Sequence, residues 1–472
     1  MSSNPATAAP TSDLANTSFR RTAGLVIGLL LALVAGLTAA GAVRGPHLVR
    51  AEVNTASAVE HPGQRLTLRL DQAVTVPTPN DVTVDPTTPV ELTNLPTSAV
   101  LKFTTALHYA TTYRVSLAVQ SADTGRRSTI TSSFTTPEPT LYTLQRASAD
   151  STQAGADPGA VAGPPDRIVR SVVGSAGSTV VRTQPHIQEF AIAEPQMAVV
   201  TADADGIGSI QVGPTDSPDK TRTVTEGERI SDLKSSGPNG IFGYIAVNET
   251  AATGPTALNT VQLRLFAPGA DARPVDVTGL DGKPVQVADW SFVPGTTLVV
   301  VQATNSAMYL VDPSRDGHVT PLGGHLTLHG LGRGTTLLVE DEDTKLTTID
   351  LVTGATTRLP PFNVHGGGLP HVQPLPDGTS YAGLLLTLTG HDQLRYSVVV
   401  LHGRKARTLH RAPADTTADA ICLSSNGEYL LLQTRPADAS QADDTGAANT
   451  VIDIATGQTL LEAAGSDASW CH

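Results

Sequence analysis

The stretch GTTLVVV at Gly295–Val301 occurs again, nearly unchanged, as GTTLLVE at Gly334–Glu340. Two later stretches, PDGT at Pro376–Thr379 and NGEY at Asn426–Tyr429, take the same place before apolar runs. The glycines Gly295, Gly334, Gly378 and Gly427 are 39, 44 and 49 residues apart. A glycine turn followed by an apolar strand at this period is typical of four-stranded propeller blades.

A second repeated motif supports the blade interpretation. IDLVTG at Ile349–Gly354 matches IDIATG at Ile452–Gly457, and each lies one hairpin after a glycine turn. Looser copies of the turn before an apolar strand occur around Gly240, before IFGYIAV, and around Gln196, before MAVVT. Together with the four clear copies they indicate six blades.

A seventh blade is expected where the two ends of this region meet. Trp470 in SDASWCH matches Trp290 in the inner strand VADWSF, but no further strands follow it. Leu141 to Arg146 and Ile168 to Val173 would supply the missing strands and close the ring. We therefore expect a propeller of seven blades over residues 140–472.

The repeat resembles TolB-like and WD-repeat propellers. The resemblance rests on the D-G-T turn before an apolar strand and on the I-D-x-x-T-G outer turn, and it covers about 330 residues. These motifs are specific to architecture, so the resemblance implies a fold and no particular activity.

Residues 47–137 show the alternation of a second all-β domain. Leu66, Leu68 and Leu70 fall on one face of a strand, and similar periods recur up to Val119, which predicts about seven short strands in a β-sandwich. LRLDQAV, LHYATTYRVSL, the turn Asp123–Gly125 and the closing SFTT resemble the SbsA (S-layer) type of bacterial Ig-like domain, although Leu70 replaces the usual Phe. The resemblance implies a spacer without catalysis, followed by the stiff linker TPEP.

The N-terminal region predicts a membrane anchor. Residues 1–21 form a polar tail expected to be disordered and cytoplasmic, and residues 22–43 carry no charge. A helix of this length reaches about 33 Å, enough for a hydrocarbon core of about 30 Å. Arg20 and Arg21 keep the N-terminus inside, so the expected topology is single-pass with the bulk extracytoplasmic. A signal peptide cleaved near Ala40–Ala42 is the alternative.

The two cysteines, Cys422 and Cys471, both fall in the part expected to be exported. An oxidising compartment allows a disulfide to persist, and we expect the two to pair and to staple the ring closure. A free buried thiol at Cys422 is the alternative.

Composition excludes some classes of function. The chain has a net charge of −13, and no basic run could follow a phosphate backbone, so nucleic acid is not an expected partner.

Candidate catalytic and metal-binding motifs are incomplete. His365–Gly368 is similar to a lipase oxyanion loop, but the chain contains no G-x-S-x-G elbow. His325, His329, His365 and His371 could meet at a central channel and hold zinc, yet separate strands do not establish convergence, and we favour scattered channel histidines. The acidic groups Asp203–Gly206 and Glu340–Asp343 do not continue as calcium loops, and Gly330–Gly334 lacks the helix of a phosphate site. We expect no catalytic residue, no metal and no cofactor.

These observations favour binding over catalysis. The expected function is that of a membrane-tethered scaffold of the bacterial cell envelope, whose Ig-like spacer presents a propeller that recognises a protein or a wall glycan. The alternative is a glycan hydrolase or lyase with its site in the channel, which would need inward-facing carboxylates or a His/Tyr set. A third possibility, a sensing partner of another membrane protein, would need that partner to carry any signal.

Overall fold

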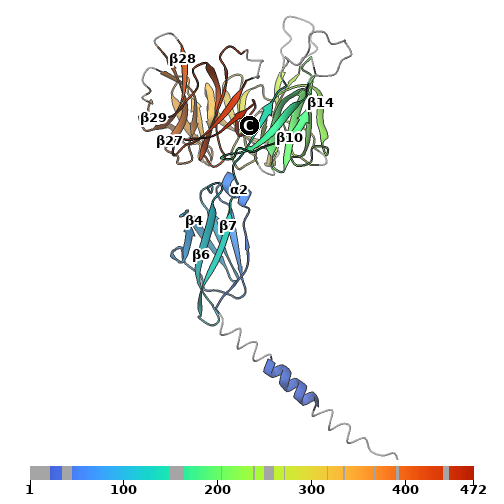
Figure 1. Ribbon diagram of the computed structural model, residues 1–472, viewed down its shortest axis with the longest axis vertical. Helices are drawn as coiled ribbons and strands as arrows, with labels where there is room; N and C mark the ends of the chain where they lie inside the picture. Colours follow the sequence, from blue (N-terminus) through green and yellow to red (C-terminus); the bar gives the residue numbers. More distant parts are fainter. Residues whose placement is uncertain are drawn as a thin grey trace, which may run out of the picture. The chain divides into compact units, whose positions relative to one another are not determined.

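The computed structural model describes residues 22–33, 45–147, 164–203, 205–237, 240–248, 260–269, 272–315, 317–332, 335–362, 364, 367–389, 393–439 and 446–471. Strands make up most of these residues, so the expected all-β class is confirmed. The chain divides into two compact units (Figure 1). The first contains Met1–Val53, Arg65–Phe103 and Thr112–Phe134, and the second contains Asn54–Gln64, Thr104–Thr111 and Thr135–His472.

The expected membrane span lies only partly within the described residues. Residues 22–33 are helical, whereas residues 34–43 lie outside the described part of the chain. None of the described helices combines the length and the apolar character needed to cross a membrane.

The first unit consists of two antiparallel sheets. One has the order β1-β2-β5-β4 and the other β3-β6-β7. Their bounds are β1 (Leu48–Glu52), β2 (Arg65–Leu70), β3 (Val82–Asp85), β4 (Val90–Leu95), β5 (Ser98–Phe103), β6 (Thr112–Gln120) and β7 (Arg127–Thr135), with a 3-10 turn η1 (Pro79–Asp81).

Alternating burial explains why these segments form strands. Leu66 and Leu68 are fully buried and Leu70 nearly so, as expected from their spacing, while Arg65 and Arg69 are exposed. Residues two apart share one face of a strand, so the leucines supply one apolar face. Phe134 of β7 lies 5.9 Å from Phe103 of the other sheet, measured between ring centroids. The two sheets therefore bury their apolar faces against one another.

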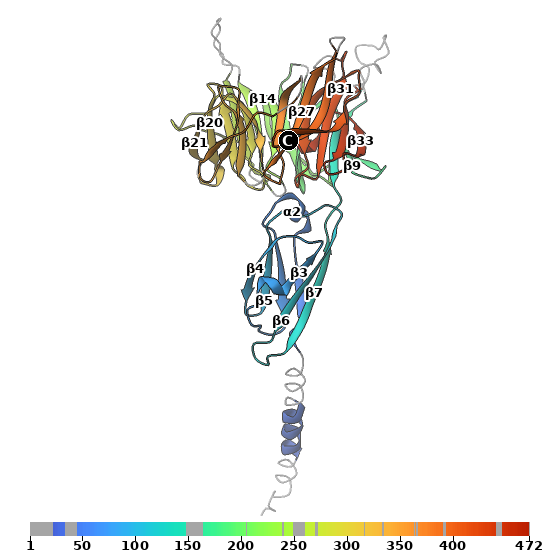
Figure 2. The ribbon, with the colours of Figure 1, turned by 90° about the vertical axis from the view of Figure 1, so that its left-hand side faces the viewer.

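The second unit is a β-propeller built from successive antiparallel sheets (Figure 2). Within the described residues these sheets form seven blades, because the seven-stranded sheet is two blades joined by the long β14. The strands of the first three blades are β8 (Thr140–Gln145), β9 (Asp166–Val172), β10 (Ser178–Gln184), β11 (Ile187–Ala193), β12 (Gln196–Ala202), β13 (Gly208–Pro214), β14 (Arg222–Ser235), β15 (Phe242–Asn248), β16 (Thr260–Phe266) and β17 (Val275–Asp276).

The remaining four blades have four strands each. They are β18 (Val287–Phe292), β19 (Val299–Ala303), β20 (Ala307–Asp312), β21 (His318–Gly324), β22 (Thr327–Leu331), β23 (Thr336–Glu340), β24 (Leu346–Asp350), β25 (Thr356–Arg358), β26 (Gly367–Pro374), β27 (Ser380–Leu388), β28 (Leu394–His402), β29 (Lys405–Arg411), β30 (Thr416–Leu423), β31 (Tyr429–Pro436), β32 (Ala448–Asp453) and β33 (Thr459–Ala464). The short helices are α2 (Thr55–Glu60), η3 (Pro313–Arg315) and η4 (Ser469–Cys471).

The repeated glycines lie at turns that require them. Gly295, Gly378 and Gly427 have φ angles of 75°, 71° and 71°, a left-handed region that side chains disfavour. Asp377 stabilises its turn by accepting hydrogen bonds from the backbone N–H groups of Thr379 and Ser380. At these three positions the motif that predicted the blades is the turn between the first and second strand of a blade.

Within the described residues, hydrogen bonds from side chains link five of the blades to the following blade. In each of these bonds, a side chain of one blade donates a hydrogen bond to, or accepts one from, a backbone group of the following blade. Two carboxylates accept from backbone N–H groups: Asp467 from Phe190 and Glu189 from Leu233. Three side chains donate to backbone carbonyls: Lys234 to Trp290, Gln302 to Leu326, and Gln373 to Ile421.

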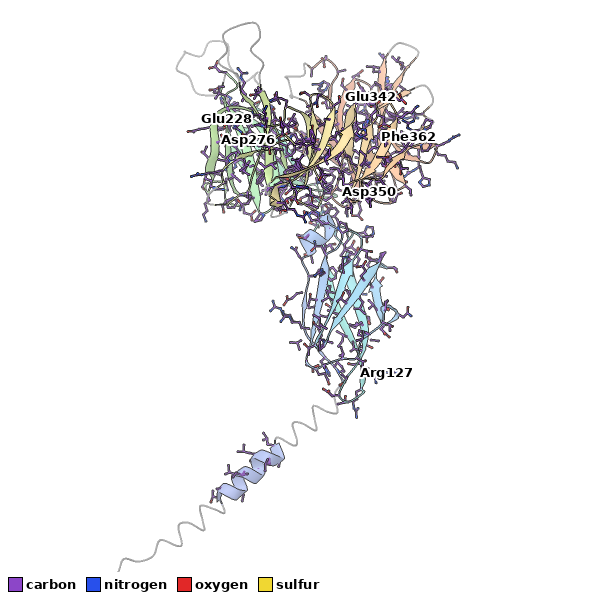
Figure 3. The ribbon with its side chains drawn as sticks, turned by 180° about the vertical axis from the view of Figure 1, so that it is seen from behind. Arg127, Glu228, Asp276, Glu342, Asp350 and Phe362 are labelled. Carbon is purple, nitrogen blue, oxygen red and sulfur yellow. A yellow bond between two sulfur atoms is a disulfide. The ribbon has the colours of Figure 1, made fainter. Side chains whose placement is uncertain are left out.

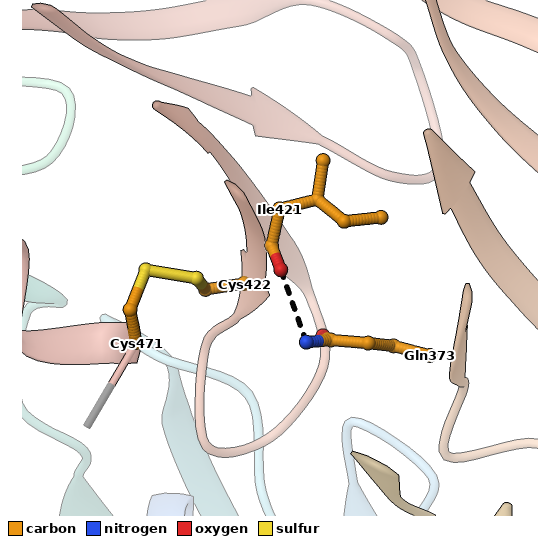
Figure 4. The surroundings of a disulfide bond; sticks show 4 residues. All are labelled: Gln373, Ile421, Cys422 and Cys471. Carbon is orange, nitrogen blue, oxygen red and sulfur yellow. Dashed lines mark hydrogen bonds between the residues drawn. A yellow bond between two sulfur atoms is a disulfide. The ribbon is translucent and has the colours of Figure 1, made fainter. Parts of the chain in front are cut away.

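The end of the chain closes the ring on its beginning. Leu144 of β8 exchanges two backbone hydrogen bonds with Ser466, so the C-terminal segment completes the first blade. The Trp470 indole N–H donates to the Thr140 carbonyl at 2.9 Å. Cys422 of the last blade is joined to Cys471 by a disulfide (Figure 4).

Candidate functional site

One face of the propeller is formed by the turns that follow the inner strands. We call it the turn face, and its described residues are 194–195, 236–237, 240–241, 293–298, 375–380 and 424–429. The ends of one blade show the two faces clearly: in Figure 3 Asp350 lies at the turn face, and Glu342 lies at the opposite end of the same blade. The opposite face carries the hairpins between the second and third strands.

Helix α2 contacts the turn face. The Asn54 side chain caps the helix by accepting a hydrogen bond from the Ser57 N–H, and Ala58 is buried. His61, which ends the helix, lies against Gly237 and Gly295, where an added Cβ atom would come within 3.4 Å and 3.1 Å of its ring. Two turn glycines therefore leave the space that His61 fills.

Residues 104–111 lie beside α2 and reach the last blade. The Leu107 N–H donates to the Ala58 carbonyl at 2.7 Å, and the Leu107 carbonyl accepts from Asn426 at 3.0 Å. The Tyr109 N–H donates to Glu428, and its ring stacks on Tyr429 with centroids 6.0 Å apart. These residues fall inside the range expected to be sandwich, yet they belong to the second unit.

An acidic group lies where α2 meets the second blade. Burial, together with the nearby Glu194, raises the pKa of Glu60 to about 8. Glu60 Oε2 is buried without a hydrogen-bond partner, and His61 Nε2 lies 4.0 Å from it. Glu194 accepts a hydrogen bond from the Tyr142 hydroxyl at 2.7 Å. Because burial and Glu194 both oppose a negative charge on Glu60, and His61 is no permanent cation, the protonated carboxyl is the form that this environment favours.

The histidines of the inner strands are paired with carboxylates. His325 Nδ1 lies 3.0 Å from Asp341, and His329 Nε2 lies 3.3 Å from Glu340. Burial lowers the pKa of His329, the hydrogen bond and the charge of Glu340 raise it, and His371 lowers it by a smaller contribution.

The described residues contain no group of three or more His, Cys, Asp or Glu side chains that could hold a metal ion. His365 and Gly366 of the glycine-rich motif lie outside the described residues, as do Ala204, Arg333 and Gly334.

The two acidic groups lie on hairpin turns. Asp203 accepts hydrogen bonds from the N–H groups of Asp205 and Ile207 and thereby closes its own turn. A hydrogen bond from Thr347 lowers the pKa of Asp341, with smaller contributions from His325 and Arg358. The carboxylate of Asp203 is therefore engaged within its own turn, and that of Asp341 is engaged with side chains of neighbouring strands.

The opposite face carries exposed apolar side chains. Leu388 and Leu394, at the two ends of the β27–β28 hairpin, are 65% and 47% exposed. With Gly367 and Gly368 they line a depression of about 500 Å³ at the end of the sixth blade. Large exposed apolar side chains beside a depression are typical of surfaces that bind a partner.

Glu60 and Glu194 were not singled out from the sequence. Glu60 lies in a short segment without strand alternation, and Glu194 precedes a proline in a turn, so neither has a local signature. The apolar pair Ala58–Val59 beside Glu60 was the available signal, because it indicates a segment that packs against something.

Comparisons with known proteins concern the fold. No protein-family model matches this chain, and no curated protein matches it. A prolyl endopeptidase structure is similar over 63% of this chain and 46% of its own, at 14% identity and a TM-score of 0.46. The β-propeller domain of the Trilobed protease from Pyrococcus furiosus matches over 75% and 95%, at 9% identity and a TM-score of 0.42. A TolB-like protein from Agrobacterium tumefaciens matches over 52% and 86%, at 18% identity and a TM-score of 0.36.

The chain spans about half the length of the prolyl endopeptidase that it matches. At identities this low, the comparisons concern only the arrangement of strands, and we infer no activity of this chain from the activities of these proteins.

Proposed function

We propose that this protein is a membrane-tethered, extracytoplasmic binding or scaffold protein of the bacterial cell envelope. Its propeller recognises a protein or a wall glycan and catalyses no reaction. A propeller is a rigid ring with loops on two faces, and such a surface can bind a partner without a catalytic residue.

The observation that supports this proposal is the difference in occupancy between the two faces. The turn face is covered in part by α2 and residues 104–111 of the same chain. The opposite face exposes Leu388 and Leu394 around a depression. A partner therefore binds the opposite face, and its apolar surface favours a protein over a glycan.

The remaining parts of the proposal come from the sequence. Residues 22–43 anchor the chain, with the N-terminus cytoplasmic, and residues 47–137 form an Ig-like spacer. The pairing of Cys422 with Cys471 suits an oxidising compartment outside the cytoplasm.

An affinity capture tests the function and the face together. The full chain, purified in detergent, is used as bait for solubilised envelope, with wall polymers added as competitors. A variant with Leu388→Asp and Leu394→Asp is compared with Val352→Asp, which alters a still more exposed apolar residue at the turn face.

The proposal expects a specific protein that is retained by the wild type and by Val352→Asp and is lost with the double variant. Equal capture by all three baits would contradict the assignment of the face. Recovery of shortened wall glycan would instead support the hydrolase or lyase alternative.

A further inference from the structure

Helix α2 reaches turns on widely separated blades. Glu60 lies near Glu194 of the second blade, and His61 lies against Gly237 and Gly295 of the third and fourth. Through Leu107, which donates its N–H to Ala58, the same segment reaches Asn426 of the seventh blade. A segment that contacts turns of these blades lies across the middle of the turn face, and Figure 2 shows α2 at this end of the propeller.

Helix α2 has little stability of its own. It has six residues, and isolated helices of this length do not persist in water. Its position depends on burying Ala58 and Val59, each 1% exposed, and on the fit of His61 against the two glycines. Anything that weakens this contact releases the helix as a unit.

Glu60 is the group in this contact whose charge can change. Its side chain is 23% exposed, and Oε2 is buried without a hydrogen-bond partner. The groups around it are His61 on its own segment, Tyr109 of the adjacent segment, and Glu194 of the second blade, whose carboxylate accepts from Tyr142. None of these is a permanent cation, and Glu194 opposes a second negative charge.

We propose that α2 is a plug for the turn-face end of the channel, seated while the Glu60 carboxyl carries its proton and loosened when that carboxyl ionises beside Glu194. The proposal is independent of what binds the opposite face.

The pH range follows from the groups involved. Released Glu60 titrates at its ordinary pKa of 4.5, and seated Glu60 has a pKa of about 8. The seated state therefore holds a proton that the released state loses, and the seating equilibrium weakens by about tenfold per pH unit between these values. Above pH 8 it weakens no further.

Other groups do not titrate in the upper part of this range. Burial lowers the pKa of His61, so above about pH 7 its ring is neutral in both states. Burial raises the pKa of Tyr109 and of Tyr142 above 10, so both hydroxyls stay protonated. Between pH 7 and pH 8 the change is that of Glu60.

Hydrogen exchange of the full chain in detergent tests the plug. The probes are the N–H groups of Ala58, His61 and Leu107, which donate to Asn54, Ser57 and Ala58, with the β19 strand as reference. After correction for intrinsic exchange, the proposal expects protection of these amides to fall about fivefold from pH 7 to pH 8, because the slope flattens as the pH reaches the pKa of seated Glu60, while β19 is unchanged. In Glu60→Gln, which cannot ionise, protection stays constant over this range.

A second variant keeps the test decisive if Glu60→Gln disturbs the helix. Glu194→Gln retains an acceptor for Tyr142 but removes the like charge, which lowers the pKa of seated Glu60, so protection should fall less between pH 7 and pH 8 than in the wild type. Constant protection in the wild type, or the same slope in Glu60→Gln, would overturn the proposal.

Discussion

The two faces of the propeller are built from the same blades but differ in what they contact. On the turn face, carboxylates and amides close short glycine turns, and Tyr109 and Leu107 of the same chain pack against them. On the opposite face, Leu388 and Leu394 remain exposed around a depression. The turn face therefore contributes to holding the second unit together, and the opposite face is free to evolve for binding. Substitutions should follow this division: large losses of stability at the turn face, and losses of binding at the opposite face.

The largest expected loss of stability is at the disulfide, which lies next to the turn of the last blade. Cys422 and Cys471 are 49 residues apart, and opening a loop of this size costs about 4 kcal/mol. Cys471→Ser should lower the free energy of unfolding by this amount, measured by chemical denaturation. Reductant should lower the stability of the wild type to that of the variant and leave the variant unchanged; equal stability of both proteins without reductant would contradict the role of the closure.

The next effect is at Leu107, which is 1% exposed in the contact between residues 104–111 and α2. Leu107→Ala removes a buried side chain and should cost about 3 kcal/mol in the same measurement. The matched control is Leu394→Ala on the opposite face, where the change should stay within about 0.5 kcal/mol. Equal costs at the two positions would remove the difference between the faces.

A smaller effect is expected from the histidines of the inner strands. Burial lowers the pKa of His329 and of His371 below the ordinary value of 6.5. The unfolded chain therefore binds more protons below pH 6.5, so this contribution to stability is present above that pH and is lost as the pH falls. His371→Gln should reduce the acid-dependent loss. An unchanged pH profile in the variant would contradict the contribution of buried His371 to this loss.

The smallest effect on stability is expected at Leu388. Leu388→Asp replaces an exposed side chain and should change the free energy of unfolding by less than about 0.5 kcal/mol. The same variant should weaken capture of the partner by at least about tenfold, measured as the retained fraction in the affinity experiment. Loss of stability together with binding would mean that Leu388 supports the fold.

Local features of the fold were predictable from the sequence because they have local causes. Gly295, Gly378 and Gly427 mark turns that need a left-handed backbone, and the alternation of Leu66 and Leu68 follows from the geometry of a half-buried strand.

The covering of the turn face was not predictable in the same way. Leu107 and Tyr109 stand next to strand β6 in the sequence, but they pack against residues more than three hundred positions away. Such a contact depends on how the ring closes, which no local pattern encodes. The buried environment of Glu60 could not be predicted for the same reason, because Glu60 is an ordinary residue of a short helix and its surroundings come from distant parts of the chain.

A cross-link tests whether residues 104–111 occupy the turn face of the propeller. The photoreactive residue p-benzoylphenylalanine is placed at Tyr109 in the full chain, irradiated, and its products are mapped by mass spectrometry. The account predicts a cross-link to the peptide around Glu428 and Tyr429, because Tyr109 stacks on Tyr429. Cross-links only to neighbouring residues of the first unit, or none within the chain, would contradict it.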